Sequence, residues 1–127
     1  MLRSSWTPGR EGGRPGPVLV SVTAFRPDRI TDVPGIRRAA RMLAASWAEL
    51  DGAHGMWLWA QPLSRRVGSV AVWRDESALH GFVAWPPHVE IVRAYRGRGS
   101  LTSLTWQTET FDPATTWARA RSALKAG

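Results

Sequence analysis

The amino-acid sequence predicts an α+β domain in which a four-stranded antiparallel sheet packs against helices. Segments with period-2 alternation and segments with apolar residues at helical spacing follow one another in the order strand, helix, strand, strand, helix, strand. An extra helical segment follows at the C-terminus. The chain has 127 residues, which is the length of one domain and enough to bury a core without a disulfide or a metal ion.

Proline, glycine and capping residues bound these segments. Pro27 ends the first strand, Asp51-Gly52 ends the first helix, and Asp75 is an N-cap for the second. Pro86-Pro87 breaks the second helix in two, because neither proline can donate a backbone hydrogen bond. The predicted strands cover 18–25, 56–61, 67–73 and 101–110, and the predicted helices cover 31–51, 75–84, 88–96 and 112–125.

The N-terminal residues differ in composition from the rest of the chain. Residues 1–16 are rich in Gly, Pro and Arg and have no periodicity. Such a segment has too few apolar side chains to offset the entropy of ordering it. We therefore expect a disordered basic arm over residues 1–16, followed by a single domain over residues 17–127.

The element order is the ferredoxin-like arrangement, with both helices on one face of an antiparallel sheet and the other face free. Alternation predicts that the free face is mixed aromatic and polar. Its expected members are Ser21, Thr23, Phe25, Trp57, Trp59, Gln61, Ser69, Ala71, Trp73, Ser103, Thr105 and Gln107. The face of Val18, Val20, Val22, Val70 and Val72 is expected to pack on the helices. The mixed face would line a ligand pocket or pack against a second copy of the chain.

Composition excludes several classes of site. The chain has no cysteine, which rules out disulfides, zinc–thiolate sites and thiol nucleophiles. It has no apolar run of the roughly 18 residues that a membrane span needs. The N-terminus lacks the apolar segment of a signal peptide, so we expect a cytoplasmic protein with no membrane partner.

The net charge of +7 raises the question of nucleic-acid binding. Lys125 is the one lysine among 17 cationic residues, and the other 16 are arginines spread over the arm and the helices. A nucleic-acid site gathers its cations in a patch or stripe. The scattered arginines instead indicate a compositional bias, so no nucleic-acid partner is expected.

Trp73 and the residues after it carry a family resemblance. Val72 to Leu79 reads Val-Trp-Arg-Asp-Glu-Ser-Ala-Leu and leads from a strand into a helix, and Phe82 and Pro87-His88 follow. With Arg93 and Arg96 downstream, this stretch resembles the dimeric α+β barrel superfamily. That superfamily includes cofactor-free antibiotic-biosynthesis monooxygenases, haem-degrading monooxygenases and spheroidene-monooxygenase-like proteins, the last of which the Pro-His step resembles most.

The resemblance implies a homodimer that closes a barrel through the free sheet face, with Trp73 as a pocket tryptophan. Two departures from the family pattern limit what it implies about chemistry. The chain contains no asparagine, whereas haem-degrading and several quinone-forming members use one. The position of the axial histidine of the haem-degrading members is Val92 here, and His88 lies one turn earlier.

His88 is the first candidate for chemistry. It lies in the first turn of a new helix, where free N–H groups and the positive end of the dipole favour a neutral imidazole that can act as a base or a ligand. The alternative is that it caps the helix break. His54, expected in a loop, and His80, expected at the surface, are secondary candidates. The candidate substrate-binding residues are Ser21, Thr23, Trp57, Trp59, Trp73, Phe82, Trp85 and Arg93.

Three functions remain open from the sequence. The first is a cofactor-free, monooxygenase-like enzyme of secondary metabolism, such as antibiotic biosynthesis, that acts on an apolar or aromatic substrate of polyketide or terpenoid type, with cyclisation or isomerisation as other reaction types. The second is a haem protein with His88 as the iron ligand. The third is a non-catalytic protein that binds a small ligand in the same pocket. No metal site other than this haem ligand is expected.

Overall fold

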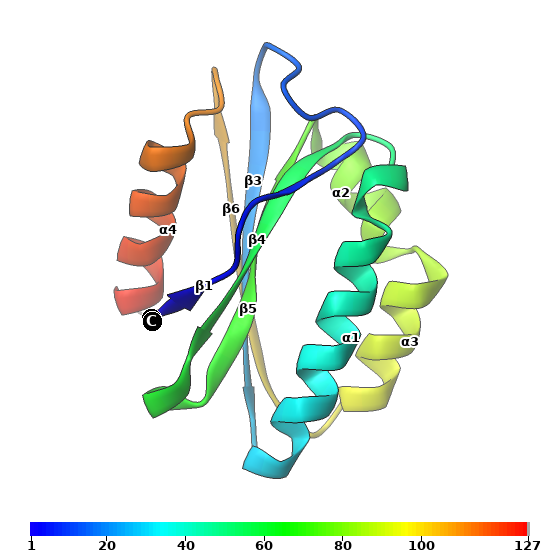
Figure 1. Cartoon of the computed structure of the whole chain (residues 1–127), viewed down its shortest axis with the longest axis vertical. Coiled ribbons are helices and arrows are strands. Elements are labelled where there is room, and N and C mark those ends of the chain that lie inside the picture. Colours follow the sequence, from blue (N-terminus) through cyan, green and yellow to red (C-terminus); the bar gives the residue numbers. More distant parts are fainter. Residues whose placement is uncertain (127) are drawn as a thin grey trace.

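The computed structural model describes residues 1–126 and confirms the α+β ferredoxin-like fold (Figure 1). In chain order the elements are β1 (Leu2–Arg3), β2 (Thr7–Pro8), β3 (Val18–Pro27), η1 (Ile30–Asp32), α1 (Val33–Ala45), η2 (Trp47–Glu49), β4 (Ala53–Gln61), η3 (Pro62–Ser64), β5 (Arg66–Trp73), α2 (Glu76–Val83), α3 (Pro86–Tyr95), β6 (Gly99–Thr108) and α4 (Pro113–Ala126). The strands form one antiparallel sheet in the order β1-β4-β5-β3-β6, and β2 also pairs with β4.

Strand β3 organises the sheet because it pairs with β5 on one side and with β6 on the other. The β3–β6 pairing runs without a register shift from Val18 opposite Thr108 to Pro27 opposite Gly99. The β3–β5 pairing runs from Leu19 opposite Trp73 to Phe25 opposite Val67. The four main strands lie where the alternation predicted them.

Strands β3 and β6 differ from their predicted bounds by two residues, and two larger differences change where candidate residues lie. Strand β4 begins at Ala53, so His54 lies inside a strand and not in a loop. The first helix was predicted to reach residue 51, but α1 ends at Ala45 because Ser46 leaves the helical conformation. Trp47 therefore lies in the separate turn η2. The predicted break of the second helix is confirmed: α2 ends at Val83 and α3 begins at Pro86.

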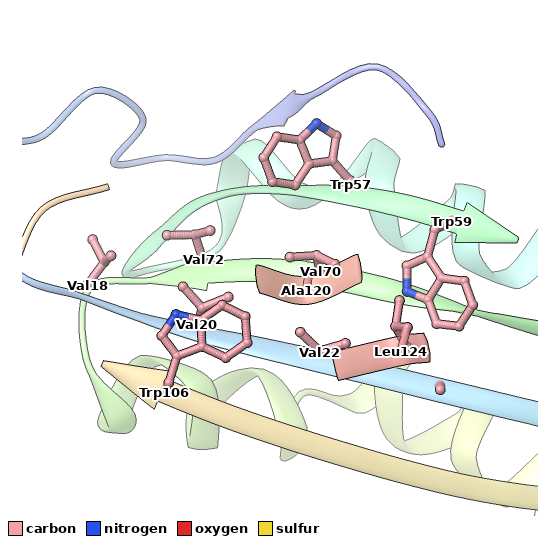
Figure 2. Close-up of a cluster of buried hydrophobic side chains, with 11 residues drawn as sticks. Val18, Val20, Val22, Trp57, Trp59, Val70, Val72, Trp106, Ala120 and Leu124 are labelled. Atoms are coloured by element: carbon pink, nitrogen blue, oxygen red, sulfur yellow. The ribbon is translucent and has the colours of Figure 1, made fainter. Parts of the chain in front are cut away.

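The two faces of the sheet are covered by different helices, as Figure 1 shows: α1, α2 and α3 lie on one face and α4 lies on the other. On the α4 face, a buried core joins the valines to three tryptophans and to α4. Its members are Val18, Val20, Val22, Ala24, Trp57, Trp59, Val70, Val72, Trp106, Ala120 and Leu124 (Figure 2). On the other face the core consists of Leu19, Trp47, Leu50, Ala53, Met56, Ala71, Trp73 and Ala78.

The predicted assignment of the two faces is therefore wrong. Ser21, Thr23 and Trp73 lie under α1–α3, not on a free face, while the valine face carries α4. Trp57 and Trp59 share the valine face, so the predicted phase of the second strand is also wrong. Both alternating sets of β4 are apolar, and a register shift between Ala53 and Gly55 sets the observed phase.

The N-terminal arm is ordered along β4, in contrast to the expected disorder. Leu2–Arg3 and Thr7–Pro8 pair with β4, and the Ser4 N–H donates to the Leu58 carbonyl at 2.8 Å. Trp6 packs against Trp57 with ring centroids 4.6 Å apart and stacks on Phe111 at 5.1 Å. Pairing with the edge of β4 and the packing of Trp6 thus hold the arm in place. The composition of residues 1–16 does not show either contact.

Charged residues fasten the end of this arm to the sheet. Glu11 accepts from Arg14 at 2.7 Å and from Arg74 at 3.0 Å, and Arg74 also lies 3.2 Å from Asp75. Asp75 caps α2 by accepting from the Ala78 N–H, which lowers the pKa of the Asp75 carboxyl. No helix within residues 1–126 is both long enough and apolar enough to cross a membrane.

We predict that Gly55 is required for the arm to dock. The ring of Trp6 occupies the space that a Cβ at Gly55 would fill. Gly55→Ala should therefore displace Trp6 and lower the free energy of unfolding by about 1–3 kcal/mol. Urea denaturation followed by circular dichroism measures the change.

A double-mutant cycle supplies the control. In a Trp6→Ala background the obstruction is gone, so Gly55→Ala should cost much less. Equal costs in the two backgrounds would contradict the docked position of Trp6.

Candidate functional site on the helix side of the sheet

Trp73 forms the floor of the candidate site. It ends β5, its side chain is fully buried, and it lies on the sheet face that α1–α3 cover. Its Nε1–H donates to the hydroxyl oxygen of Ser21 on the neighbouring strand at 3.1 Å. A buried indole N–H needs such an acceptor, so this bond fixes the position of the ring.

An aromatic series leads from Trp73 to the helix break. The ring of Trp73 lies 5.1 Å from that of Trp47 and 5.2 Å from that of Phe82, measured between centroids. Phe82 in turn lies 4.4 Å from the imidazole of His88 and 6.2 Å from Trp85. The prediction that Trp73, Phe82, Trp85 and His88 belong to one site is consistent with these contacts.

His88 takes its orientation from the helix break. Its Nδ1 lies 3.1 Å from the Val83 carbonyl oxygen, at the C-terminal end of α2. A carbonyl only accepts, so in the neutral imidazole this contact places the ring proton on Nδ1 and leaves Nε2 unprotonated. Among residues 1–126, Nε2 has no hydrogen-bond partner. His88 thus donates a hydrogen bond to the last turn of α2 and still has Nε2 available as a base. The two roles considered for it from the sequence, cap of the helix break and base, are therefore compatible.

Hydroxyl groups lie on the same face of the sheet. Thr23 Oγ1 and Ser69 Oγ, on paired strands, are 2.9 Å apart. One of the two hydroxyls donates within the pair, and the hydrogen of the other is left for a further acceptor. Ser21, which bonds to Trp73, and this pair thus place three hydroxyls along the same face of the sheet.

The helices over this face are only loosely packed on it. Neither α1 nor α3 contains a fully buried residue. Thr23, Phe25 and Ser69 are half-buried, whereas Ser21 and Trp73, nearer the other end of the sheet, are buried. Tyr95 of α3 contacts Phe25 edge-to-face, with centroids 6.4 Å apart. Solvent therefore reaches Thr23, Phe25 and Ser69 but not Ser21 or Trp73.

Three predicted substrate-binding residues lie away from this cluster. Trp57 and Trp59 belong to the core under α4, on the opposite face of the sheet. Arg93 is on the exposed side of α3 and forms no ion pair within the described chain.

The other two histidines also lie elsewhere. His54 is buried in β4, where desolvation is the largest influence and lowers the pKa of its imidazole, against the opposing effect of Glu11. His80 is exposed on α2, with Nε2 3.6 Å from Glu76. Neither contacts the aromatic series of Trp73.

Sequence reasoning missed two members of the site. Trp47 was assigned to the first helix and not to the site, although a large aromatic directly after a helix often packs on the sheet below it. Ser69 was expected on the same face as Thr23 but was not selected as a site residue. The signal that could have found it is its register, because Ser69 lies directly opposite Thr23.

Residues 1–126 contain no cluster of three His, Asp or Glu side chains that could hold a metal ion. Among the three histidines, His88 is the one whose ring contacts the aromatic series.

Solved structures share this fold at low sequence identity. A candidate antibiotic biosynthesis monooxygenase from Deinococcus radiodurans superposes with a TM-score of 0.61 at 13% identity, covering 69% of this chain and 89% of that one. SnoaB, a cofactor-independent oxygenase from Streptomyces nogalater, gives 0.60 at 18%, covering 76% and 97%. A dimeric ferredoxin-like protein of unknown function from Jannaschia gives 0.62 at 14%, covering 70% and 97%.

These matches confirm that the chain has the fold of the antibiotic-biosynthesis-monooxygenase-like and dimeric ferredoxin-like proteins. No protein-family model matches the sequence, and none of the curated proteins matches it.

We predict that His54 makes stability depend on pH. Burial lowers the pKa of His54 below its ordinary value of about 6.5, so the unfolded chain binds the proton more readily than the folded one. The free energy of unfolding should therefore fall as the pH drops below about 6.5, by at most about 1.4 kcal/mol per pH unit. Urea denaturation between pH 7.5 and 5 measures this slope.

His54→Gln should flatten the slope, whereas His80→Gln, at an exposed position, should leave it unchanged. A slope that survives in His54→Gln would mean that another group titrates in this range.

Proposed function

We propose that the protein is a small oxygenase-like enzyme that acts on an apolar aromatic substrate at the site of Phe82, Trp85 and His88, under α1–α3. The observation that carries the proposal is the free Nε2 of His88 at the end of the Trp73–Phe82 series. A base beside a wall of aromatic rings, with a few hydroxyl groups, suits a flat ring system that carries an acidic hydroxyl.

Each group at the site has a proposed part in binding or chemistry. Phe82 and Trp85 supply the aromatic wall, and the buried Trp73, held in place by Ser21, supports Phe82 from below. Thr23, paired with Ser69, offers a hydroxyl to a substrate oxygen. The substrate is an aromatic metabolite of polyketide or terpenoid type, which places the enzyme in secondary metabolism, such as antibiotic biosynthesis.

The proposed reaction needs no electron donor besides the substrate. His88 Nε2 removes a proton from the substrate hydroxyl, and the resulting electron-rich ring forms a carbon–oxygen bond with dioxygen. Loss of water from this adduct breaks the oxygen–oxygen bond and leaves a carbonyl. The substrate loses one hydrogen from its hydroxyl and one from the ring carbon that gains oxygen, the second oxygen leaves as water, and the substrate supplies every electron.

Support from other proteins is limited to the fold. SnoaB is a cofactor-independent oxygenase and shares the arrangement of sheet and helices at 18% identity. Function depends on the residues at a site and not on the fold, so the matches make the reaction class a reasonable choice and assign no residue.

Haem binding is the second candidate, and one observation favours it. Histidines that bind metals through Nε2 commonly donate Nδ1–H to a backbone carbonyl, as His88 does to Val83. His88 would therefore hold the iron through Nε2, and a bound haem would supply the dioxygen chemistry in place of the substrate's own electrons.

We predict that oxygen uptake with electron-rich polycyclic phenols depends on His88. His88→Gln should lower kcat about 10²–10⁴-fold, because proton removal by a positioned base contributes that much. His80→Gln is the matched control and should retain full activity. An oxygen electrode together with product absorbance measures the rates, and a haemin titration of the same samples detects a Soret shift.

The outcomes separate the candidates. Saturable haemin binding that His88→Gln abolishes would favour the haem protein. Binding of the phenols without oxygen uptake would favour a non-catalytic ligand-binding protein. Unchanged turnover in His88→Gln would contradict the proposed role of His88.

A further inference from the structure

Three arginines share the side of α1 that faces away from the sheet. Arg37 and Arg41 are four residues apart, and Arg38 and Arg41 are three apart, so one side of the helix carries all three. All three residues are exposed. In Figure 1, α1 lies beside α3 on the outside of the sheet. The arginines border a shallow, open hollow together with Val33, Pro34, Met42 and Ala45.

The chain itself does not neutralise these charges. α1 contains no Asp or Glu, and within residues 1–126 none of the three arginines forms an ion pair. Asp32 lies directly before the helix, but its Oδ1 is 3.6 Å from Nη1 of Arg98. Like charges one turn apart on a helix repel each other and destabilise it. The three arginines therefore lower the stability of α1, and no carboxylate of the described chain offsets this cost.

Two large apolar side chains accompany the arginines. Met42 is 67% exposed, follows Arg41 and lies one turn from Arg38. Ile30 is 65% exposed and lies in η1, one turn before Pro34. A single exposed apolar residue is ordinary on a protein surface. Here two of them lie beside unpaired arginines, and a helix surface that combines both kinds of side chain is typical of proteins that lie on a membrane.

We propose that the outer side of α1 binds the surface of a membrane that contains anionic phospholipids. The guanidinium groups of Arg37, Arg38 and Arg41 donate to the lipid phosphates, which match the paired N–H groups of arginine. Ile30 and Met42 enter the boundary between the headgroups and the acyl chains. The axis of α1 then lies parallel to the membrane surface.

A nucleic acid is the other polyanion that three arginines could bind, but the apolar side chains favour the lipid. The backbone of a duplex offers phosphates and no apolar region for Ile30 and Met42. Single strands bind through aromatic side chains on which their bases stack, and no aromatic residue lies in α1 or borders its hollow. A membrane therefore accounts for both kinds of side chain on this surface, and a nucleic acid accounts for one.

This partner differs from the expectation from the sequence. We expected no membrane partner because the chain has neither an apolar run for a span nor the apolar segment of a signal peptide, but a contact at the membrane surface requires neither. The arginines were interpreted as scattered, because only the helix brings Arg37, Arg38 and Arg41 to one side. The contact uses the side of α1 that faces away from the sheet, so it and the proposed activity at His88 can fail independently.

We predict that the protein binds vesicles of phosphatidylcholine mixed with phosphatidylglycerol and not vesicles of phosphatidylcholine alone. Each arginine near an anionic surface strengthens binding about fivefold, so Arg37→Gln, Arg38→Gln and Arg41→Gln combined should lower the partition coefficient about 100-fold. Added salt should also weaken the binding. Co-sedimentation of the full chain with the vesicles measures the partition coefficient.

The matched control removes the same charge elsewhere. Arg10, Arg26 and Arg121 are exposed and lie in the arm, on β3 and on α4. Arg10→Gln, Arg26→Gln and Arg121→Gln combined should leave most of the binding intact. Circular dichroism checks that both triple variants fold.

Apolar insertion separates a lipid from a nucleic acid. Met42→Ser keeps the charge and should weaken vesicle binding about threefold or more, because less apolar surface enters the membrane, without changing binding to duplex DNA. The natural chain has no cysteine, so Met42→Cys can carry an environment-sensitive fluorophore. Its emission should shift to shorter wavelength on the anionic vesicles, whereas the same fluorophore attached through Leu63→Cys, exposed in η3, should not respond.

Three results would overturn the proposal. The first is a natural protein that does not bind the anionic vesicles. The second is an equal loss of binding in the two triple variants, because net charge and not α1 would then cause the binding. The third is tighter binding to duplex DNA than to the vesicles, dependent on the α1 arginines, with no shift of the fluorophore at Met42→Cys, which would assign the surface to a nucleic acid.

Discussion

The alternation of side chains along β3 determines which groups can meet in this protein. Because β3 pairs with β5 and β6, its two sets of side chains define the two faces of the sheet. Val18, Val20 and Val22 face α4 and form a core with Trp57, Trp59 and Trp106, while Leu19, Ser21, Thr23 and Phe25 face α1–α3. The polar members of the second set have a partner within the sheet, Trp73 for Ser21 and Ser69 for Thr23. The candidate site follows from this division.

The helix break between α2 and α3 orients another residue of the same site. Pro86 and Pro87 cannot continue α2, and the carbonyls at the end of α2 are left without intrahelical donors. The imidazole of His88 donates to one of them, the Val83 carbonyl, and packs against Phe82. A local need for a hydrogen bond thus fixes the protonation site and orientation of the one histidine beside the aromatic series. The base and the floor of the site are supplied by adjoining segments, Trp73 at the end of β5 and His88 just after the break.

Local patterns in the sequence were enough for the element order, the cap at Asp75 and the break at Pro86-Pro87. Long-range packing was not. The phase of β4 depends on a register shift between Ala53 and Gly55, and both of its alternating sets are apolar. The order of the arm depends on its pairing with β4, on the contacts of Trp6 with Trp57 and Phe111 and on the ion pairs of Glu11, none of which composition shows. The role of α4 as a cover for the valine face likewise becomes visible only in three dimensions.

The central claim is that neutral His88 carries its proton on Nδ1 and presents a free Nε2. Nitrogen-15 NMR of the labelled protein at neutral pH tests this directly, with the resonances of His88 assigned by their loss in His88→Gln. The account predicts a protonated Nδ1 and an unprotonated Nε2 shift for this residue. A neutral imidazole with its proton on Nε2 would contradict it, since the contact with the Val83 carbonyl could not then be a hydrogen bond.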